Sequence, residues 1–105
     1  MEQSFSLKDK VIVVTGGTGI LGKAFIDAIV EAGGTVGILG RNEQVANERA
    51  DEINNNGGKA IALIADAMNE EQLIAARDKV LAAYGKIDGL VNAAGGNMPD
   101  GVLLP

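Results

Sequence analysis

A glycine-rich turn between an apolar run and a helical pattern constrains this chain more than any other feature. Residues 10–15 read KVIVVT, a β-branched run typical of a central strand buried on both faces of a sheet. The glycines that follow form G-x-G-x-x-G at Gly17, Gly19 and Gly22. Beyond them the sequence predicts a helix whose polar face carries Lys23, Asp27 and Glu31. Its buried stripe is expected at apolar positions 20, 21, 24, 25, 28, 29 and 32.

The same alternation continues along the chain. A second strand is predicted over residues 35–39, followed by a helix that Asn42 can cap. A third strand over residues 59–65 precedes a helix that Asn69 can cap, with Leu73, Ala76, Val80 and Tyr84 on one side, and a fourth strand covers residues 87–92. Short links between such elements favour parallel strands joined by right-handed crossovers. We therefore predict an α/β, doubly wound Rossmann sheet with strand order 3-2-1-4 and helices on both faces.

Composition narrows the chemistry. The 105 residues fit a single domain, residues 1–105, and with 47% hydrophobic but 3% aromatic residues the core must be aliphatic. The absence of Cys and His excludes a disulfide framework, a thiol nucleophile and the commonest general base. The net charge of -5, with scattered basic residues, argues against nucleic-acid partners. No signal peptide and no membrane span is evident, so we expect a cytoplasmic protein.

The end of the sequence carries an expectation of its own. The fourth strand is apolar on both faces, which predicts cover above and below and pairing on its outer side. A chain ending at Pro105 would leave that edge bare and would expose Val102, Leu103 and Leu104. We expect the natural polypeptide to continue past this point, or a partner chain to cover the edge.

The glycine pattern points to a dinucleotide site. Glycines permit a tight turn and a close approach of the backbone to a pyrophosphate, and the helix start offers unpaired N–H groups to the anion. The plainer alternative is a turn without a ligand. A P-loop is a further alternative, since residues 17–23 fit G-x-x-x-x-G-K and residues 61–66 resemble an apolar strand ending in an aspartate. Ala24 stands where a P-loop needs a hydroxyl for magnesium, which weakens that interpretation.

The residues after the second strand bear on the choice of cofactor. An NAD site usually places Asp or Glu at the end of that strand, but this chain has Gly40 and Arg41. A guanidinium can bind a 2'-phosphate through charge-assisted hydrogen bonds. NADP(H) is therefore favoured over NAD(H), the alternative being that Arg41 is a solvated residue before a helix.

Four segments together resemble the short-chain dehydrogenase/reductase family. They read TGGTGILG at residues 15–22, GRN at 40–42, DA at 66–67 and VNAAG at 91–95. The resemblance implies that the loop holds the pyrophosphate, the second segment the adenosine ribose or its phosphate, the third the adenine edge, and the last the adenosine side and sheet centre. The implied cofactor-binding residues are Gly16, Thr18, Gly19, Ile20, Leu21, Gly22, Arg41, Asn42, Asp66, Ala67, Asn92, Ala93, Ala94 and Gly95.

Two of these residues have structural alternatives. Asp66 can be a strand-end turn residue or a helix cap, and Asn92 a buried amide that links strands. The chain also departs from the family's common patterns, because the loop spacing is closer to an extended branch and N-N-A-G has become NAAG at residues 92–95. The combined loop and AGGN pattern resembles D-mannonate (fructuronate) oxidoreductases, and this resemblance implies a sugar or polyol acid as the substrate.

The resemblance implies an NAD(P)-dependent oxidoreductase that interconverts a carbonyl and a secondary alcohol. The family's catalytic Ser, Tyr-x-x-x-Lys and Asn have no match in the 105 residues, and Tyr84 is expected to pack rather than react, so no catalytic residue and no metal ligand is predicted. Besides the small-molecule substrate, the family implies a homo-oligomer, a tetramer or dimer. The competing function is a non-catalytic nucleotide-binding module, and less favoured is the P-loop NTPase.

Overall fold

The computed structural model describes residues 6–93 as strictly alternating strands and helices. The order along the chain begins with β1 (Val11–Thr15), α1 (Ile20–Glu31), β2 (Thr35–Gly40) and α2 (Glu43–Asn55). It continues with β3 (Lys59–Ile64), α3 (Glu70–Tyr84) and β4 (Gly89–Asn92). β1, β2 and β3 are each followed by a helix that carries the chain back across the sheet, as parallel pairing requires.

All neighbouring strands are parallel, and their order is β3-β2-β1-β4. The predicted order 3-2-1-4 is confirmed. In the register, Thr15 lies beside Leu39 of β2 on one side and beside Asn92 of β4 on the other, while Gly40 lies beside Ile64 of β3. The carboxyl ends of all four strands therefore reach one edge of the sheet, where the glycine-rich turn begins.

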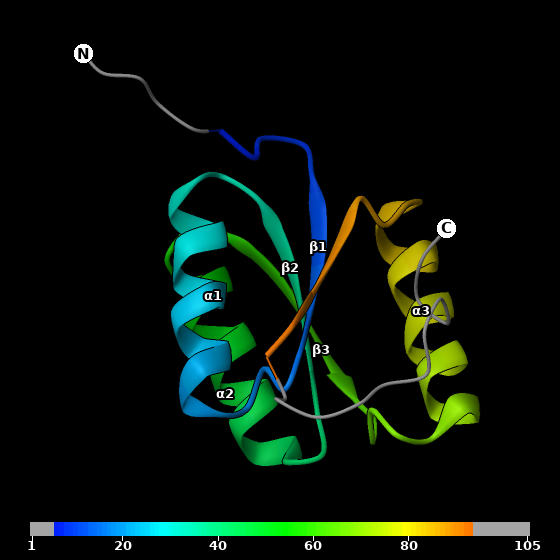
Figure 1. The fold of residues 1–105 in the computed structure, drawn as a ribbon. Coiled ribbons are helices and arrows are strands. Elements are labelled where there is room, and N and C mark those ends of the chain that lie inside the picture. Colours follow the sequence, from blue (N-terminus) through cyan, green and yellow to red (C-terminus); the bar gives the residue numbers. More distant parts are fainter. Residues whose placement is uncertain (1–5, 94–105) are drawn as a thin grey trace.

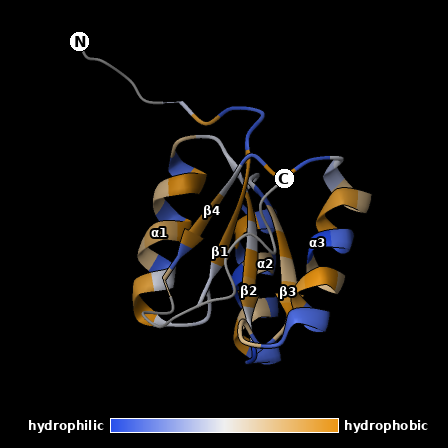
Figure 2. Ribbon diagram, turned by 45° about the vertical axis from the view of Figure 1, so that its right-hand side comes forward, coloured by the Kyte–Doolittle hydropathy of each residue, from blue (hydrophilic) through white to orange (hydrophobic). Residues whose placement is uncertain are grey.

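Helices cover both faces of this sheet, as predicted. Figure 1 shows α1 and α2 on one side and α3 on the other. Val14, Ile26 and Ala50 belong to the core beneath α1 and α2, whereas Val13 and Leu73 belong to the core beneath α3. Figure 2 shows the strands largely in the orange of hydrophobic residues, in keeping with burial from both sides.

Of the predicted apolar stripe of α1, position 29 is buried as expected, but the stripe as a whole is wrong, and the error has a local cause. Gly22 packs against the turn before the helix and so fixes the rotation of α1 about its axis. Residues four and seven positions further on, Ile26 and Ile29, consequently turn inward and are buried. The neighbouring apolar side chains are left on the outer surface of the described chain, with exposed fractions of 93% for Ile20, 57% for Leu21 and 39% for Phe25. The polar face is confirmed by the exposed ion pair of Lys23 with Asp27 at 2.8 Å.

The predicted caps of the other two helices are confirmed. The Oδ1 atom of Asn42 accepts a hydrogen bond from the Val45 N–H, and Oδ1 of Asn69 accepts one from Gln72, both at 3.0 Å. The predicted side of α3 is also confirmed, since Leu73, Ala76 and Val80 are buried and Tyr84 packs partly buried against the same core.

The last strand is shorter than predicted, because β4 starts at Gly89 rather than at residue 87. Within residues 6–93 it pairs with β1 alone, and Leu90 and Val91 are half-buried. In the same range no helix combines the length and apolar character that a membrane span requires.

Candidate functional site

The turn after β1 folds back over the ends of the central strands. Gly16 has a φ of +70°, a left-handed conformation that favours glycine, and its carbonyl accepts a hydrogen bond from the Gly19 N–H at 3.1 Å. The Gly17 N–H donates to the carbonyl of Leu39 at the end of β2, at 2.9 Å. A Cβ atom at Gly17 would stand 2.9 Å from Cγ2 of Ile38, so the turn lies too close to β2 for a side chain.

Gly22 brings the first turn of α1 into contact with this turn. A Cβ atom at position 22 would come within 2.1 Å of the Gly16 carbonyl oxygen and 2.8 Å of the Gly17 Cα atom. Both neighbours are backbone atoms that cannot rotate away. The glycine is therefore required for the close packing of helix on turn.

The amino end of α1 differs from those of α2 and α3. Asn side chains cap the other two helices, and their first turns carry Glu43 or the pair Glu70 and Glu71. In α1 the N-cap is Gly19, which offers no side-chain cap, and the first turn has no acidic residue. Within residues 6–93, the partial positive charge of this helix end is thus balanced neither by a capping side chain nor by an acidic residue of its own first turn.

Several amide groups of this segment remain available. Within residues 6–93, the N–H groups of Thr18, Ile20, Leu21 and Gly22 have no hydrogen-bond partner. Those of Gly17 and Gly19 are already used inside the fold, as described above. The donors available to an anion are therefore Thr18 and the first turn of α1, not every amide of the glycine-rich segment.

A residue that was not predicted from the sequence binds the carbonyl groups of the glycine-rich turn. Arg49 of α2 donates from Nη1 to the carbonyl oxygens of Gly17, at 2.5 Å, and Gly19, at 2.8 Å. These contacts join residues 32 and 30 positions apart, and no local pattern signals them. Arg49 has no ion pair within the described chain, so its charge is directed at the turn.

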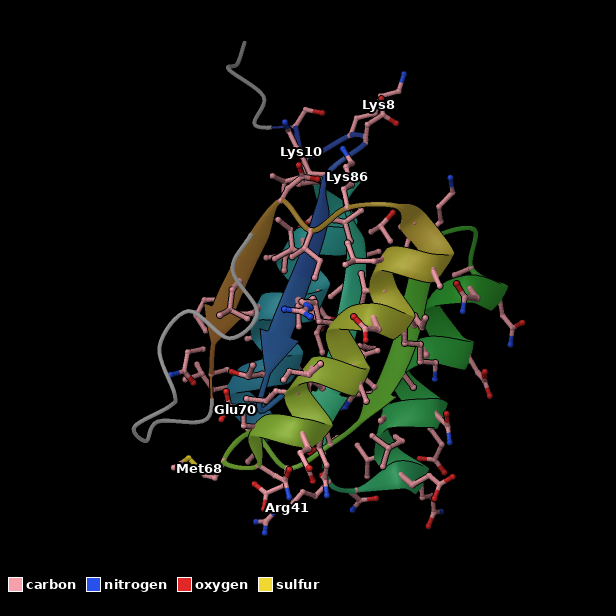
Figure 3. The ribbon with its side chains drawn as sticks, turned by 90° about the vertical axis from the view of Figure 1, so that its right-hand side faces the viewer. Lys8, Lys10, Arg41, Met68, Glu70 and Lys86 are labelled. Atoms are coloured by element: carbon pink, nitrogen blue, oxygen red, sulfur yellow. The ribbon has the colours of Figure 1, made fainter. Side chains whose placement is uncertain are left out.

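The end of β2 lies beside the glycine-rich turn. A Cβ atom at Gly40 would stand 2.6 Å from Oγ1 of Thr18, so the Thr18 side chain occupies the space that a residue with a side chain would need. Arg41 follows and is exposed. Figure 3 shows Arg41, Met68 and Glu70 at this end of the molecule and Lys8, Lys10 and Lys86 at the other. The structure thus places a cation, and no carboxylate, directly after β2.

Asp66 and Ala67 follow β3 at the same edge. Oδ1 of Asp66 accepts a hydrogen bond from the Met68 N–H at 2.9 Å, and the Asp66 N–H donates to Oε1 of Gln72 at 2.7 Å. The turn role of Asp66 is therefore confirmed, and its backbone N–H is hydrogen-bonded to a side chain of α3. Ala67 is half-buried against the core beneath α3.

Asn92 ends β4 next to the end of β1. The buried Thr15 hydroxyl lies 3.1 Å from Oδ1 of Asn92 and 3.4 Å from the Val91 carbonyl oxygen, and can donate to either. Asn92 links the strands as expected but is exposed rather than buried. Ala93 donates its N–H to the Thr15 carbonyl at 3.0 Å. Ala94 and Gly95 lie outside the described residues.

At the opposite edge of the sheet, the carboxylate of Asp88 makes hydrogen bonds within the fold. Oδ2 of Asp88 accepts hydrogen bonds from the Val11 N–H at 2.8 Å and from Nζ of Lys86 at 3.1 Å. The backbone bond from Val11, followed by the bond from Lys86, lowers the pKa of Asp88 below its usual value. Among residues 6–93, no group of three or more acidic side chains is placed to hold a metal ion.

The geometry agrees with the outcome of comparison with known proteins. A family profile described as short chain dehydrogenase matches residues 10–103. The chain belongs to the short-chain dehydrogenase family. A Bacillus subtilis relative, the uncharacterized oxidoreductase UxuB, is 36% identical over 97 residues, which are 92% of this chain and 35% of that protein. The 7alpha-hydroxysteroid dehydrogenase of Escherichia coli K12 is 35% identical over 99 residues, 94% of this chain and 39% of that enzyme.

Solved structures of short-chain dehydrogenases share the fold. A candidate D-mannonate oxidoreductase from Haemophilus influenza, with bound NAD, superposes with a TM-score of 0.81 at 32% identity, covering 90% of this chain and 34% of that one. A 7alpha-hydroxysteroid dehydrogenase complexed with NADH and 7-oxo glycochenodeoxycholic acid gives a TM-score of 0.82 at 32% identity, covering 96% and 41%. This chain therefore spans well under half the length of these family members.

Proposed function

We propose that this chain is the nucleotide-binding part of an NAD(P)-dependent oxidoreductase that interconverts a carbonyl and a secondary alcohol. The observation that carries the proposal is the amino end of α1, where, within residues 6–93, four amide groups have no hydrogen-bond partner and the helix has neither a side-chain cap nor an acidic residue in its first turn. Such an end binds an anionic group well. Membership of the short-chain dehydrogenase family makes a dinucleotide pyrophosphate the anion of choice.

The proposed site follows the carboxyl edge of the sheet. Gly16 and residues 18–22 would hold the pyrophosphate, Arg41 and Asn42 the adenosine ribose or its phosphate, Asp66 and Ala67 the adenine edge, and residues 92–95 the adenosine side. Because Oδ1 of Asn42 caps α2, its free amide group is the part that remains for a ribose hydroxyl. When bound, the nicotinamide cofactor supplies the redox chemistry, while these residues bind and orient it.

The proposal assigns no catalytic residue to this chain. Tyr84, the single tyrosine, ends α3 and packs partly buried against the core, away from the glycine-rich turn at the other end of the helix. Lys23 is paired with Asp27 on the outer face of α1, which disfavours the P-loop alternative because a P-loop lysine must reach a phosphate.

We further propose a preference for NADP(H). The exposed guanidinium of Arg41 and the missing carboxylate after β2 support it. Charge-assisted hydrogen bonds to a 2'-phosphate contribute about 1.5 to 3 kcal/mol, which corresponds to a preference of about 10- to 150-fold. Two of the similar structures hold NAD or NADH, so both cofactors belong in the test.

Titration of the chain with NADPH, NADH and ATP with magnesium tests the binding proposal directly. Saturable binding of NADPH, weaker binding of NADH and no binding of ATP is the expected result. Binding of ATP with magnesium alone would replace the proposal with the P-loop alternative. Binding without any turnover of alcohols or carbonyls by the protein that contains this segment would favour the non-catalytic module.

A sugar acid is the proposed substrate. The support is the resemblance of the loop pattern to D-mannonate (fructuronate) oxidoreductases and the similar candidate D-mannonate oxidoreductase structure. Assays of the enzyme containing this segment with D-mannonate, a 7α-hydroxysteroid and cyclopentanol distinguish the substrates named for its relatives. A cytoplasmic homo-oligomer, dimer or tetramer, is also proposed from the family, and cell fractionation with light scattering tests it.

A further inference from the structure

We infer that Arg49 is a positioning residue that sets the direction of the phosphate-binding amide groups of Thr18 and Ile20. The inference rests on the proposed function and deepens it. It starts from a feature of the peptide bond. In a trans peptide the carbonyl of one residue and the N–H of the next belong to one rigid plane and point in opposite directions.

The two carbonyls that Arg49 binds belong to the relevant peptide units. The Gly17 carbonyl shares its plane with the Thr18 N–H, and the Gly19 carbonyl shares its plane with the Ile20 N–H. All peptide bonds in the described chain are trans. Arg49 binds both oxygens, at 2.5 and 2.8 Å, and the Gly19 oxygen also accepts the Lys23 N–H at 3.1 Å, whereas Arg49 is the partner of the Gly17 oxygen within the described residues. Both unpaired N–H groups are therefore turned away from Arg49.

The chemistry of arginine suits this role. A guanidinium donates several hydrogen bonds from a rigid plane, so it can fix two carbonyls at once. A hydrogen bond accepted by a carbonyl also polarises its peptide unit, which makes the N–H on the far side a stronger donor. Glycine-rich backbone is otherwise the most freely rotating kind, and the surrounding turn has few side chains to restrain it. Arg49 therefore adds, from α2, a side-chain restraint on the carbonyl groups to the backbone hydrogen bonds that the Gly17 and Gly19 N–H groups already make.

The test compares the chain with Arg49→Met, Arg49→Lys and Lys23→Met. Lys23→Met is the matched control. It removes a cation that is close in sequence to the turn, but this cation contacts Asp27 and not the carbonyl groups of the turn. Dissociation constants are measured for NADPH and for adenosine 2'-monophosphate, which lacks the pyrophosphate. Backbone ¹⁵N relaxation of Thr18 and Ile20 is measured without nucleotide.

We expect Arg49→Met to weaken NADPH binding about tenfold or more, with adenosine 2'-monophosphate changed less than about twofold. Arg49→Lys, which keeps the charge on a shorter side chain, should fall between Arg49→Met and the unaltered chain. The order parameters of Thr18 and Ile20 should drop from about 0.85 to below about 0.6 in Arg49→Met. Lys23→Met should leave all these values near those of the unaltered chain.

Equal weakening by Arg49→Met and Lys23→Met would overturn the inference, since it would reflect net charge alone. Unchanged order parameters at Thr18 and Ile20 would overturn it as well. If Arg49→Met does not fold, the relaxation of Arg49→Lys decides the question in the same way. If the unaltered chain fails to bind NADPH, the proposed function falls, while the relaxation measurement still tests Arg49 independently.

Discussion

Gly22 and Gly16 approach each other so closely that a Cβ atom on the first would lie 2.1 Å from the carbonyl oxygen of the second. The contact joins the first turn of α1 to the turn that follows β1. It also decides which residues of α1 face the sheet, because the helix cannot rotate while Gly22 remains in place. The position of the free amide groups and the buried face of α1 therefore have a common origin.

Gly22→Ala should consequently destabilise the fold. Overpacking of this kind costs about 1 to 3 kcal/mol, and the upper part of that range is expected because the obstacle is backbone. Gly19→Ala is the matched control, since a Cβ atom there would meet its nearest neighbour at 3.5 Å and the φ of -92° suits alanine. The measurement is the free energy of unfolding in urea. Equal loss in the two variants would contradict the packing argument.

Arg41→Ala should change cofactor choice rather than stability. Removal of the guanidinium from an exposed position after β2 should weaken NADPH binding about 10-fold or more and leave NADH binding nearly unaltered. The ratio of the two dissociation constants is the quantity to measure. A ratio equal to that of the unaltered chain would show that Arg41 is only a solvated residue.

Asn42→Ala and Asn69→Ala should each cost about 1 kcal/mol of unfolding free energy, because each side chain caps a helix with a hydrogen bond of 3.0 Å. The two variants are a matched pair. Only Asn42 lies in the proposed ribose site, so only its variant should also weaken NADPH binding. A similar loss of affinity in both would mean that helix fraying, and not a ribose contact, is responsible.

The pH dependence of stability should contain a contribution from Asp88. Its pKa is lowered in the folded chain by the Val11 N–H and then by Lys86, so its stabilising effect is fully present above the unfolded pKa of about 3.9 and is lost as the pH falls through the lower folded value. Asp88→Asn should therefore be less stable than the unaltered chain at neutral pH. The difference between the two should vanish in strong acid.

Urea unfolding between neutral and strongly acidic pH measures this effect. Asp51→Asn serves as the control, because it removes the same charge from an exposed position on α2. A difference between Asp88→Asn and the unaltered chain that does not shrink on acidification would contradict the assignment.

Local patterns predicted the fold well because this fold is built from local units. The β-branched run at β1, the Asn caps of α2 and α3 and the short links were enough for the strand order β3-β2-β1-β4. The prediction of the buried face of α1 was wrong because the sequence of that helix contains two apolar stripes, and either could face the sheet. A contact with backbone at Gly22, which leaves no trace in hydrophobic periodicity, selects between them.

The candidate site was harder to predict from the sequence than the fold was. Arg49 resembles any solvated helix residue, and its partners are carbonyl groups of glycines about thirty positions away. For Asp66 the sequence left a turn role and a helix-cap role open, and the hydrogen bond from the Met68 N–H identifies the turn role. Interactions made by backbone atoms carry little side-chain information, so they were the part that sequence could not predict.

The uncapped amino end of α1 has a consequence for how this protein responds to heat. The helix begins without the side-chain acceptor that caps α2 and α3, so the phosphate group of a nucleotide bound as proposed would act as its cap. Ligand present at 100 times its dissociation constant adds about 2.7 kcal/mol of stability. For a small domain, that corresponds to a rise in melting temperature of about 10 °C or more. The empty chain should thus be the most heat-sensitive form, with its α1 turn the first helix end to fray.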